Sequence, residues 1–142
     1  MLSFRSRSKR LAPLAGLVLA CALSTGAVGQ QQRITNPVAE FTGVDKITGR
    51  IITFDVYVNE TVQFGALQVT PRVCYSSPLT EEPKTDSFVE VDEITLDRKI
   101  RRIFTGWMFA EIPGLNAVEH AVYDVWLKGC KDKSDVPAPK PG

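Results

Sequence analysis

The sequence is poor in the residues and motifs on which most catalytic and metal sites depend. It contains one histidine, His120, among 142 residues. It has no Gly-x-Ser-x-Gly motif, no glycine-rich phosphate loop and no spacing of Cys, His, Asp or Glu that is typical of a metal site. We therefore expect no cofactor, no metal and no catalytic residues.

An excess of charge of one sign is also missing. The chain has 17 Lys and Arg against 16 Asp and Glu. Four of the basic residues lie in the first ten positions, so the remainder has 13 basic against 16 acidic residues and a net charge of −3. Nucleic-acid-binding proteins normally carry a basic stripe that replaces the counterions of the phosphates. No nucleic-acid partner is therefore expected.

The first 29 residues have the three-part pattern of a secretory signal peptide. A basic start is followed by an apolar stretch over residues 11–23 and then by small residues that include Ala27 and Gly29. The stretch is shorter than the about 20 residues that a membrane-spanning helix needs, and no twin-arginine pair is present. We expect cleavage after Gly29, export to the periplasm by the general secretory route and no membrane span in the mature chain. Acylation of Cys21 as a lipoprotein is the alternative, which the apolar residues after Cys21 disfavour.

Cleavage would leave Cys74 and Cys130 as the two thiols of an exported protein, and such proteins commonly hold disulfides. A redox pair usually lies close in sequence, and a zinc site needs two further ligands that one histidine does not readily supply. We expect a structural disulfide, with a redox pair or a metal pair as alternatives. Closing a loop of about 57 residues would stabilise the fold by on the order of 4 kcal/mol in the chain-entropy model.

The mature chain is expected to form one domain over residues 39–130, after a polar leader over residues 30–38. Residues 131–142 are rich in proline and charge and should form a disordered tail. Within the domain, apolar and polar residues alternate with a period of two, and no sustained helical stripe occurs. Short strands at this spacing predict an all-β fold, as a single small antiparallel sandwich or barrel.

Individual segments support more specific predictions. Asn59 and Glu60 should turn the strand over residues 51–58 into a tight hairpin with residues 61–64. Because Pro71 has no N–H to donate, the strand over residues 67–75 should lie at an edge or carry a bulge there, with Cys74 on the face opposite Leu67. Apolar residues on both faces of residues 103–110 predict a central strand covered on both sides.

Two groups of polar residues are candidates for chemistry. Glu90 and Asp92 share a strand face about 6.6 Å apart, a spacing that suits an inverting glycosidase. The expected hairpin also returns basic residues alongside them, which favours a ladder of ion pairs made by Lys99, Arg101 and Arg102. His120 lies near Glu119, Tyr123 and Asp124, but the nearby serines, Ser76, Ser77 and Ser87, have no nucleophile motif. We expect His120 to be a surface or packing residue.

Aromatic residues are dense over residues 107–126. Such residues form a core, line a groove for sugar or peptide, or anchor an interface. The sequence alone leaves these alternatives open. The candidate binding surface consists of Trp107, Phe109, His120, Tyr123 and Trp126.

Several long phrases are similar to one known family. They are FGALQVTPRVCY over residues 64–75, IFTGWMFA over 103–110, PGL over 113–115 and VEHAVYDVW over 118–126, followed by Cys130. The chain resembles the bacterial Domain-of-Unknown-Function 2155 family over about residues 37–130. The resemblance implies an exported protein of Gram-negative bacteria, chiefly of the alpha class, with no assigned activity and no catalytic residue to carry over. The resemblance also implies a gene neighbourhood that includes the gene for a small accessory subunit of respiratory NADH dehydrogenase.

These observations predict a non-catalytic interaction or structural module in the periplasm. The resemblance adds the specific hypothesis of an accessory or assembly partner of an inner-membrane respiratory complex, so the expected partner is a cell-envelope protein or membrane complex. The alternative is an aromatic-groove binder of envelope glycan or peptide, and a hydrolase is a more distant one.

Overall fold

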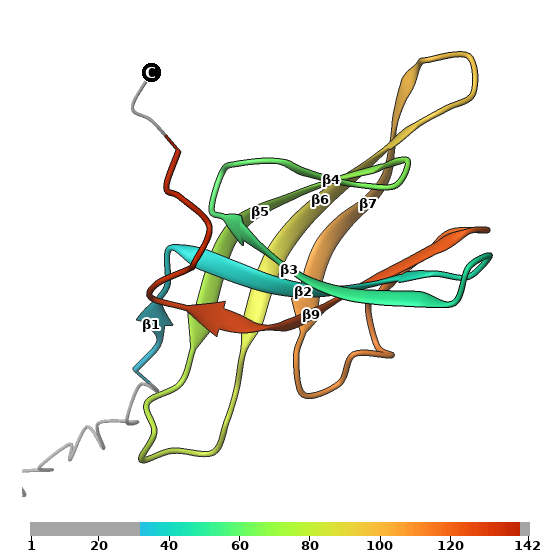
Figure 1. Cartoon of the computed structure of the whole chain (residues 1–142). Coiled ribbons are helices and arrows are strands. Elements are labelled where there is room, and N and C mark those ends of the chain that lie inside the picture. The colour runs from blue at the N-terminus through green and yellow to red at the C-terminus, as the bar shows by residue number, and fades with distance from the viewer. Residues whose placement is uncertain (1–31, 140–142) are drawn as a thin grey trace, which may run out of the picture. The chain divides into compact units, whose positions relative to one another are not determined.

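A computed structural model describes residues 32–139 of the chain (Figure 1). This part is built from strands and turns without a helix, and so contains no helix that could span a membrane. The strands are β1 (Ile34–Thr35), β2 (Val38–Asp45), β3 (Arg50–Tyr57), β4 (Val62–Phe64), β5 (Leu67–Ser76), β6 (Asp86–Ile94), β7 (Ile100–Phe109), β8 (Val118–Glu119) and β9 (Tyr123–Lys131). The predicted all-β class is confirmed.

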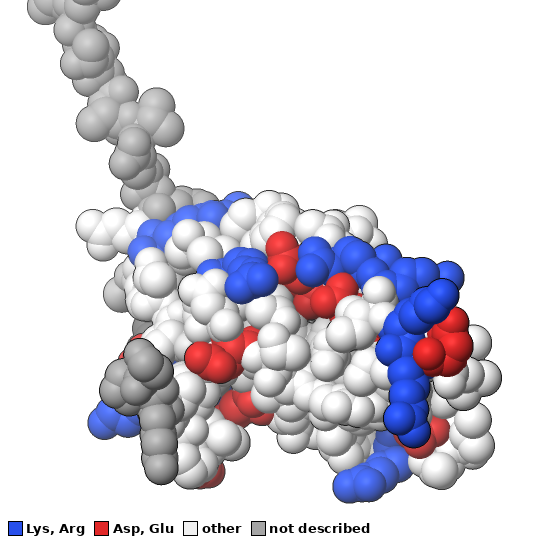
Figure 2. Space-filling model, turned by 90° about the horizontal axis from the view of Figure 1, so that it is seen from above, with Lys and Arg blue, Asp and Glu red and all other residues white. Residues whose placement is uncertain are grey.

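The strands form two antiparallel sheets that pack face to face as a sandwich. In sheet A the order is β1-β5-β6-β7, with β4 also paired to β5, and in sheet B it is β3-β2-β9-β8. The strands of sheet B run across those of sheet A in Figure 1. The β2–β3 and β6–β7 turns lie at the same end of the sandwich (Figure 1), and Figure 2 shows a run of basic side chains along that end.

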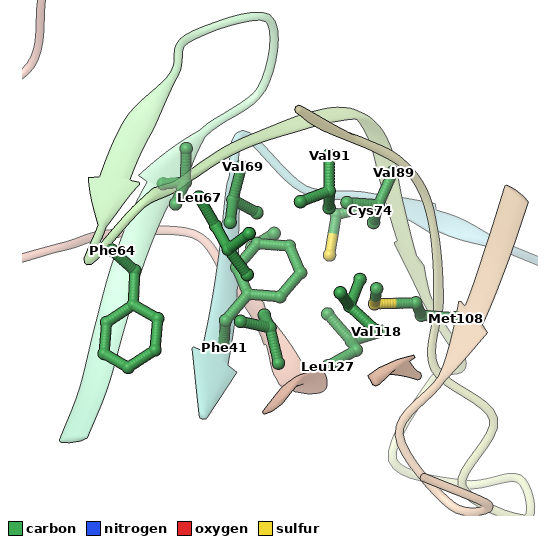
Figure 3. Packing of buried hydrophobic residues seen from close by; sticks show 13 residues of the cluster. Phe41, Phe64, Leu67, Val69, Cys74, Val89, Val91, Met108, Val118 and Leu127 are labelled. Carbon is green, nitrogen blue, oxygen red and sulfur yellow. The ribbon is translucent and has the colours of Figure 1, made fainter. Parts of the chain in front are cut away.

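The core lies between the two sheets and is filled by the apolar half of the period-two pattern. On β6, Val89 and Val91 are fully buried, while Glu90 between them faces outward. The largest fully buried side chains come from both sheets (Figure 3): Phe41, Leu67, Met108 and Leu127. Burying each such side chain stabilises the fold by about 1.5–3 kcal/mol, so the alternation decides which face of each strand turns inward.

A disulfide between Cys74 and Cys130 joins the two sheets covalently. Cys74 lies on β5 of sheet A, Cys130 lies on β9 of sheet B, and their Cα atoms are 5.8 Å apart. Cys74 is fully buried within the core. The predicted structural disulfide is confirmed, and the two sulfurs are bonded to each other rather than to a metal.

The prediction that Cys74 faces away from Leu67 is wrong, because β5 carries a bulge. The register between β5 and β6 shifts between Pro71 and Val73, as expected for a proline in this strand. One extra residue in a strand exchanges the two faces beyond it. Leu67 and Cys74 therefore both point into the core, although they are separated by an odd number of positions.

The prediction of a central strand over residues 103–110 is also wrong. In the described part of the chain β7 is the outermost strand of sheet A, and Met108 is its one fully buried residue. Ile103 and Phe104 pack against the edge of the core, whereas Trp107 lies beside aromatic side chains of neighbouring strands and not beneath a second layer. On the free edge, the Asn116 side chain donates to the Trp107 carbonyl at 2.9 Å, and the Ile112 N–H donates to the carbonyl of Phe109.

The expected hairpin at Asn59 and Glu60 is a crossing between sheets instead. β3 pairs with β2 in sheet B, whereas β4 pairs with β5 in sheet A. Asn59 adopts a left-handed conformation with φ of 68° at the crossing. The tight turn follows β4, at Gly65.

The ends of the described region contact the sandwich. β1 and the first residue of β2 fall within the segment expected to be a leader, and Val38 is fully buried. After β9, Ser134 donates to Asp55, and the Tyr57 hydroxyl donates to the Val136 carbonyl at 2.6 Å. Burial raises the pKa of Asp55, but the hydrogen bonds from Ser134 and Lys131 and the charge of Lys131 together lower it below its usual value. The expected signal peptide, with Cys21 and Gly29, lies outside the described residues.

Removal of the disulfide should destabilise the protein strongly. Replacing both cysteines, Cys74→Ala with Cys130→Ala, should lower the free energy of unfolding by about 4 kcal/mol, because the unfolded chain regains the freedom of a long loop. Urea denaturation measures the change, and reduced wild-type protein should unfold at nearly the same urea concentration as the double variant. A loss below about 1 kcal/mol would show that the core alone holds the sheets together.

Gly65 should not tolerate a side chain. Its φ is +58°, and an added Cβ would lie 2.3 Å from the ring of Tyr123. Gly65→Ala should therefore cost about 2 kcal/mol or more in thermal or urea unfolding. Gly114→Ala is the matched control, since its Cβ would meet nothing within 4 Å, and it should change stability by less than about 0.5 kcal/mol. Equal stability of the two variants would contradict the close packing of Tyr123 on this turn.

Candidate functional site

The structure distributes the five predicted binding residues over several places. Trp107 and Phe109 lie on the outer face of sheet A. Trp126 lies on the outer face of sheet B, opposite Thr42 of β2. Tyr123 points inward, with its ring 5.5 Å from the ring of Phe64. His120 lines a separate cleft. One shared aromatic groove is therefore not formed by these residues.

Trp107 instead belongs to an aromatic face on the outside of sheet A, which consists of Val73, Tyr75, Phe88 and Trp107. Val73, Phe88 and Trp107 are direct partners across β5, β6 and β7. The Trp107 ring stacks on Tyr75 with centroids 6.2 Å apart and meets Phe88 edge-on at 5.5 Å. Trp107 remains 37% exposed. The face is therefore an apolar, partly solvent-exposed surface.

Arg33 closes one side of this face. Its guanidinium lies 5.3 Å from the centroid of the Tyr75 ring and donates to Asp86 at 2.8 Å. Burial raises the pKa of Asp86, against the lowering effect of Arg33. One Asp86 carboxylate oxygen is buried without a hydrogen-bond partner among the described residues. Arg33 thus compensates only part of the cost of burying this carboxylate beside the aromatic face.

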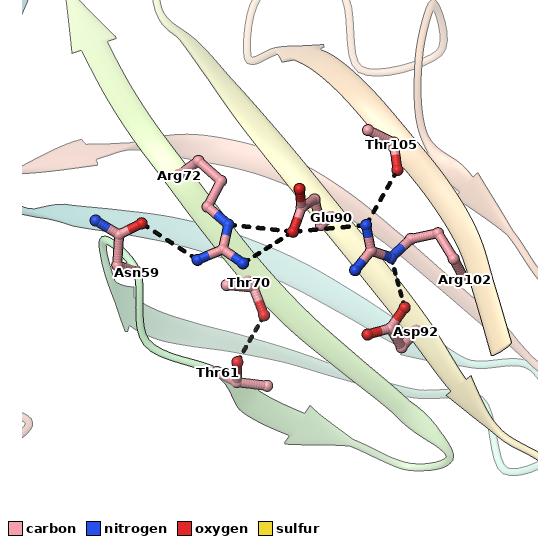
Figure 4. Close-up of polar contacts among 8 residues, drawn as sticks. All are labelled: Asn59, Thr61, Thr70, Arg72, Glu90, Asp92, Arg102 and Thr105. Atoms are coloured by element: carbon pink, nitrogen blue, oxygen red, sulfur yellow. Dashed lines mark hydrogen bonds and ion pairs between the residues drawn. The ribbon is translucent and has the colours of Figure 1, made fainter. Parts of the chain in front are cut away.

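A charged ladder runs across the same sheet next to the aromatic face (Figure 4). Arg72 on β5 donates twice to Glu90 on β6, at 3.1 and 3.0 Å. Arg102 on β7 lies 3.5 Å from Glu90 and also donates to Asp92, a hydrogen bond that raises the pKa of Arg102. Both carboxylates considered for a glycosidase are thus held by arginines, which supports the predicted ion-pair ladder. Lys99 differs from the expectation, because it lies nearest to Asp97 in the turn.

His120 lines an open cleft of about 700 Å³ at one end of the sandwich. Its Nε2 lies 3.0 Å from a carboxylate oxygen of Glu93, and its Nδ1 accepts the Val122 N–H at 3.0 Å. Because Nδ1 is the acceptor, the proton of a neutral ring lies on Nε2 and points to Glu93. The other oxygen of Glu93 accepts from Arg101 at 2.8 Å. Hydrogen bonds from His120 and then Arg101 lower the pKa of Glu93.

The three serines considered as nucleophiles are committed to other partners. Ser87 donates to the Val73 carbonyl, and Ser77 donates to the Glu82 carbonyl. Ser76 accepts from the Asn36 side chain. Among residues 32–139, the side-chain partners of His120 include no hydroxyl group. The cleft therefore combines an imidazole with an acid but does not present an activated nucleophile to them.

Several residues of the aromatic face could not be found from the sequence. Tyr75 and Phe88 meet Trp107 only because β5, β6 and β7 are neighbours in this register. Arg33 lies in the segment expected to be a leader. The period-two pattern did indicate the orientation of Phe88. Because its neighbour Val89 is buried, Phe88 must face outward from β6.

Comparison with known proteins gives one match. No curated protein and no solved structure matches the chain. A family model described as an uncharacterised protein conserved in bacteria, Domain of Unknown Function 2155, matches residues 39–130. The match spans well over half of the chain, from the second residue of β2 to Cys130 on β9, and leaves out β1. The chain belongs to this Domain-of-Unknown-Function 2155 family of bacterial proteins.

Proposed function

We propose that the protein is a non-catalytic interaction module of the periplasm, and that the aromatic face of sheet A contacts a cell-envelope protein. The proposal rests on the exposure of Trp107, which lies on an edge strand with its ring supported by Tyr75 and Phe88. The outer face of an antiparallel sheet is normally polar. A supported, partly exposed tryptophan is instead typical of residues that dominate the binding energy of interfaces.

The surroundings of Trp107 suit a protein partner. Arg33 and Arg72 border the aromatic face and keep part of their side chains exposed. Arginine is enriched with tryptophan and tyrosine in the centres of interfaces, because it combines a flat apolar surface with several donors. The aromatic face would supply buried area, and the arginines would supply polar contacts at its rim.

The periplasmic location is supported by the signal-peptide pattern of residues 1–29 and by the disulfide. Disulfides are common in oxidising compartments and rare in the cytosol of mesophiles. The family resemblance adds a specific partner hypothesis, an inner-membrane respiratory complex for which this protein is an accessory or assembly factor. Such a complex would have to expose a surface on the periplasmic side.

A structural role for His120 supports the non-catalytic part of the proposal. Both ring nitrogens already have partners, Glu93 and the Val122 N–H. A general base needs a free nitrogen within hydrogen-bond reach of the proton that it removes. His120 instead ties the loop before β9 to β6.

The second candidate function is binding of an envelope glycan or peptide on the same aromatic face. The stacked pair of Tyr75 and Trp107 favours it, since their rings lie at an interplanar angle of 26° and could support a sugar ring. A Trp126→Phe variant leaves Trp107 as the one tryptophan of the chain. Quenching of its fluorescence by peptidoglycan fragments would favour glycan binding over a protein partner.

The two tryptophans provide a matched test of the proposed partner surface. Trp107→benzoylphenylalanine, irradiated in intact cells, should give a discrete crosslinked product with an envelope protein, because the face is expected to be covered by that partner. The same substitution at Trp126, on the opposite sheet, should give little product. Mass spectrometry of the products measures the difference and identifies the partner. Equal crosslinking from both positions, or none from position 107, would contradict the proposal.

The respiratory hypothesis needs a separate measurement. Tagged protein should co-purify with detergent-solubilised respiratory complex, and Trp107→Ser should reduce the recovered complex at least about tenfold, as expected for a residue that dominates an interface. Trp126→Ser is the control. Recovery of a different envelope protein would reject the respiratory partner and retain the interaction module.

A further inference from the structure

Two turns at one end of the sandwich expose large aliphatic side chains. At the β2–β3 connection, Ile47 in the turn and Ile51 near the start of β3 are 77% and 66% exposed. At the β6–β7 connection, Leu96 in the turn and Ile100 at the start of β7 are 107% and 63% exposed. Each turn thus presents a pair of aliphatic side chains, and neither pair belongs to the core. We call residues 45–51 and 95–102 the two tips.

Both tips are basic. The first has two basic residues, Lys46 and Arg50, against one acidic residue, and the second has four basic residues against Asp97. Together they carry a net charge of +4, whereas residues 11–142 as a whole carry −3. The positive charge of the domain is therefore concentrated on the tips, which agrees with the run of basic side chains in Figure 2.

A chain of polar contacts holds the tips at the same end. Lys46 of the first tip donates to the backbone carbonyl of His120 at 2.5 Å. The His120 ring contacts Glu93, and Glu93 accepts from Arg101 of the second tip. Figure 1 likewise shows the two turns pointing to one side. The tips can therefore contact one surface together.

Nearby acidic residues lie deeper than the basic residues that they pair with. The Arg101 side chain is 68% exposed, and its partner Glu93 is 16% exposed. Arg102 is likewise more exposed than Asp92, and Lys46 is more exposed than Asp124. The outermost charge on this end is consequently positive, even though each pair is neutral overall.

We propose that the two tips bind the headgroup region of an anionic lipid membrane and insert their aliphatic side chains at its acyl boundary. Protruding aliphatic residues mixed with Lys and Arg suit this interface, because the headgroup phosphates attract the cations while the acyl chains accept the apolar groups. A protein partner would more often meet such side chains in a contiguous patch. On the tips they are instead separated by cations.

This inference deepens the proposed function, since a tip-bound protein would be held at the membrane where its partner complex lies. It also stands apart from that function experimentally. Binding of purified protein to lipid vesicles needs no protein partner, whereas crosslinking at position 107 needs one.

Vesicle flotation tests the inference with the mature, disulfide-bonded protein. It should float with phosphatidylcholine vesicles that contain phosphatidylglycerol, remain unbound with phosphatidylcholine alone, and bind less in high salt because the salt screens the charges. The double variant Leu96→Ser/Lys99→Glu should lose at least about tenfold in affinity, since it removes an inserted side chain and reverses a charge.

The chain offers a closely matched control. Leu79 is as exposed as Leu96, at 105%, but lies in the β5–β6 loop beside Glu81 and Glu82. Leu79→Ser combined with Lys133→Glu makes the same chemical changes away from the tips and should keep wild-type binding. Circular dichroism and the melting temperature confirm that both variants fold.

Three outcomes would overturn the inference. They are absence of wild-type binding to phosphatidylglycerol vesicles, equal binding of the Leu96/Lys99 double variant and wild type, and equal loss in the Leu79/Lys133 control. Crosslinking of the tips to an acidic protein, without vesicle binding, would assign this end to a protein partner instead. None of these outcomes changes what is expected of Trp107.

Discussion

The covalent link between Cys74 and Cys130 is the constraint on which the sandwich and its outer face both depend. It joins β5 and β9, which belong to different sheets and are far apart in the chain. The sulfur of Cys130 lies 3.6 Å from the carbonyl oxygen of Tyr75 and 4.0 Å from that of Asp86. The backbone that positions the Tyr75 ring and the Arg33–Asp86 pair is thus fixed from beneath by the disulfide. Loosening this bond would disturb the aromatic face as well as the core.

Local sequence pattern was sufficient for the fold class but not for the arrangement of strands. The alternation on β6 places Val89 inward and Glu90 outward as expected, and the ion pairs of Arg102 with Glu90 and Asp92 in the β6–β7 hairpin follow from it. The inward position of Cys74 could not be predicted without knowing that the bulge near Pro71 shifts the register. β4 pairs with β5 rather than with β3, because it joins the sheet that faces β3. The sequence of such a short strand carries no signal that shows which of the two sheets it joins.

For the candidate site too, the sequence identified individual residues but not their arrangement in space. Trp107 and Trp126 are close in sequence, yet they lie on the outer faces of opposite sheets, because β7 and β9 belong to sheets A and B. Tyr75 and Phe88 are distant in sequence from Trp107 and meet it through strand pairing. Apolar residues on both faces of β7 predicted a layer over each face, which is wrong for the outer face, where Trp107 is 37% exposed. They could not show that the outer partners are two aromatic rings, which leave Trp107 partly exposed.

The edge position of β7 has a consequence for association between copies of the chain. A long edge strand with unsatisfied backbone groups is a template for intermolecular sheet extension and fibril growth. Here the Asn116 side chain and the Ile112 N–H donate hydrogen bonds to the carbonyls of Trp107 and Phe109. These carbonyls at one end of the edge are therefore already satisfied. Along the other half, Arg101 and Arg102 would bring like charges together in any edge-to-edge pairing of two copies. The strand can therefore display a tryptophan to a partner while it discourages self-polymerisation.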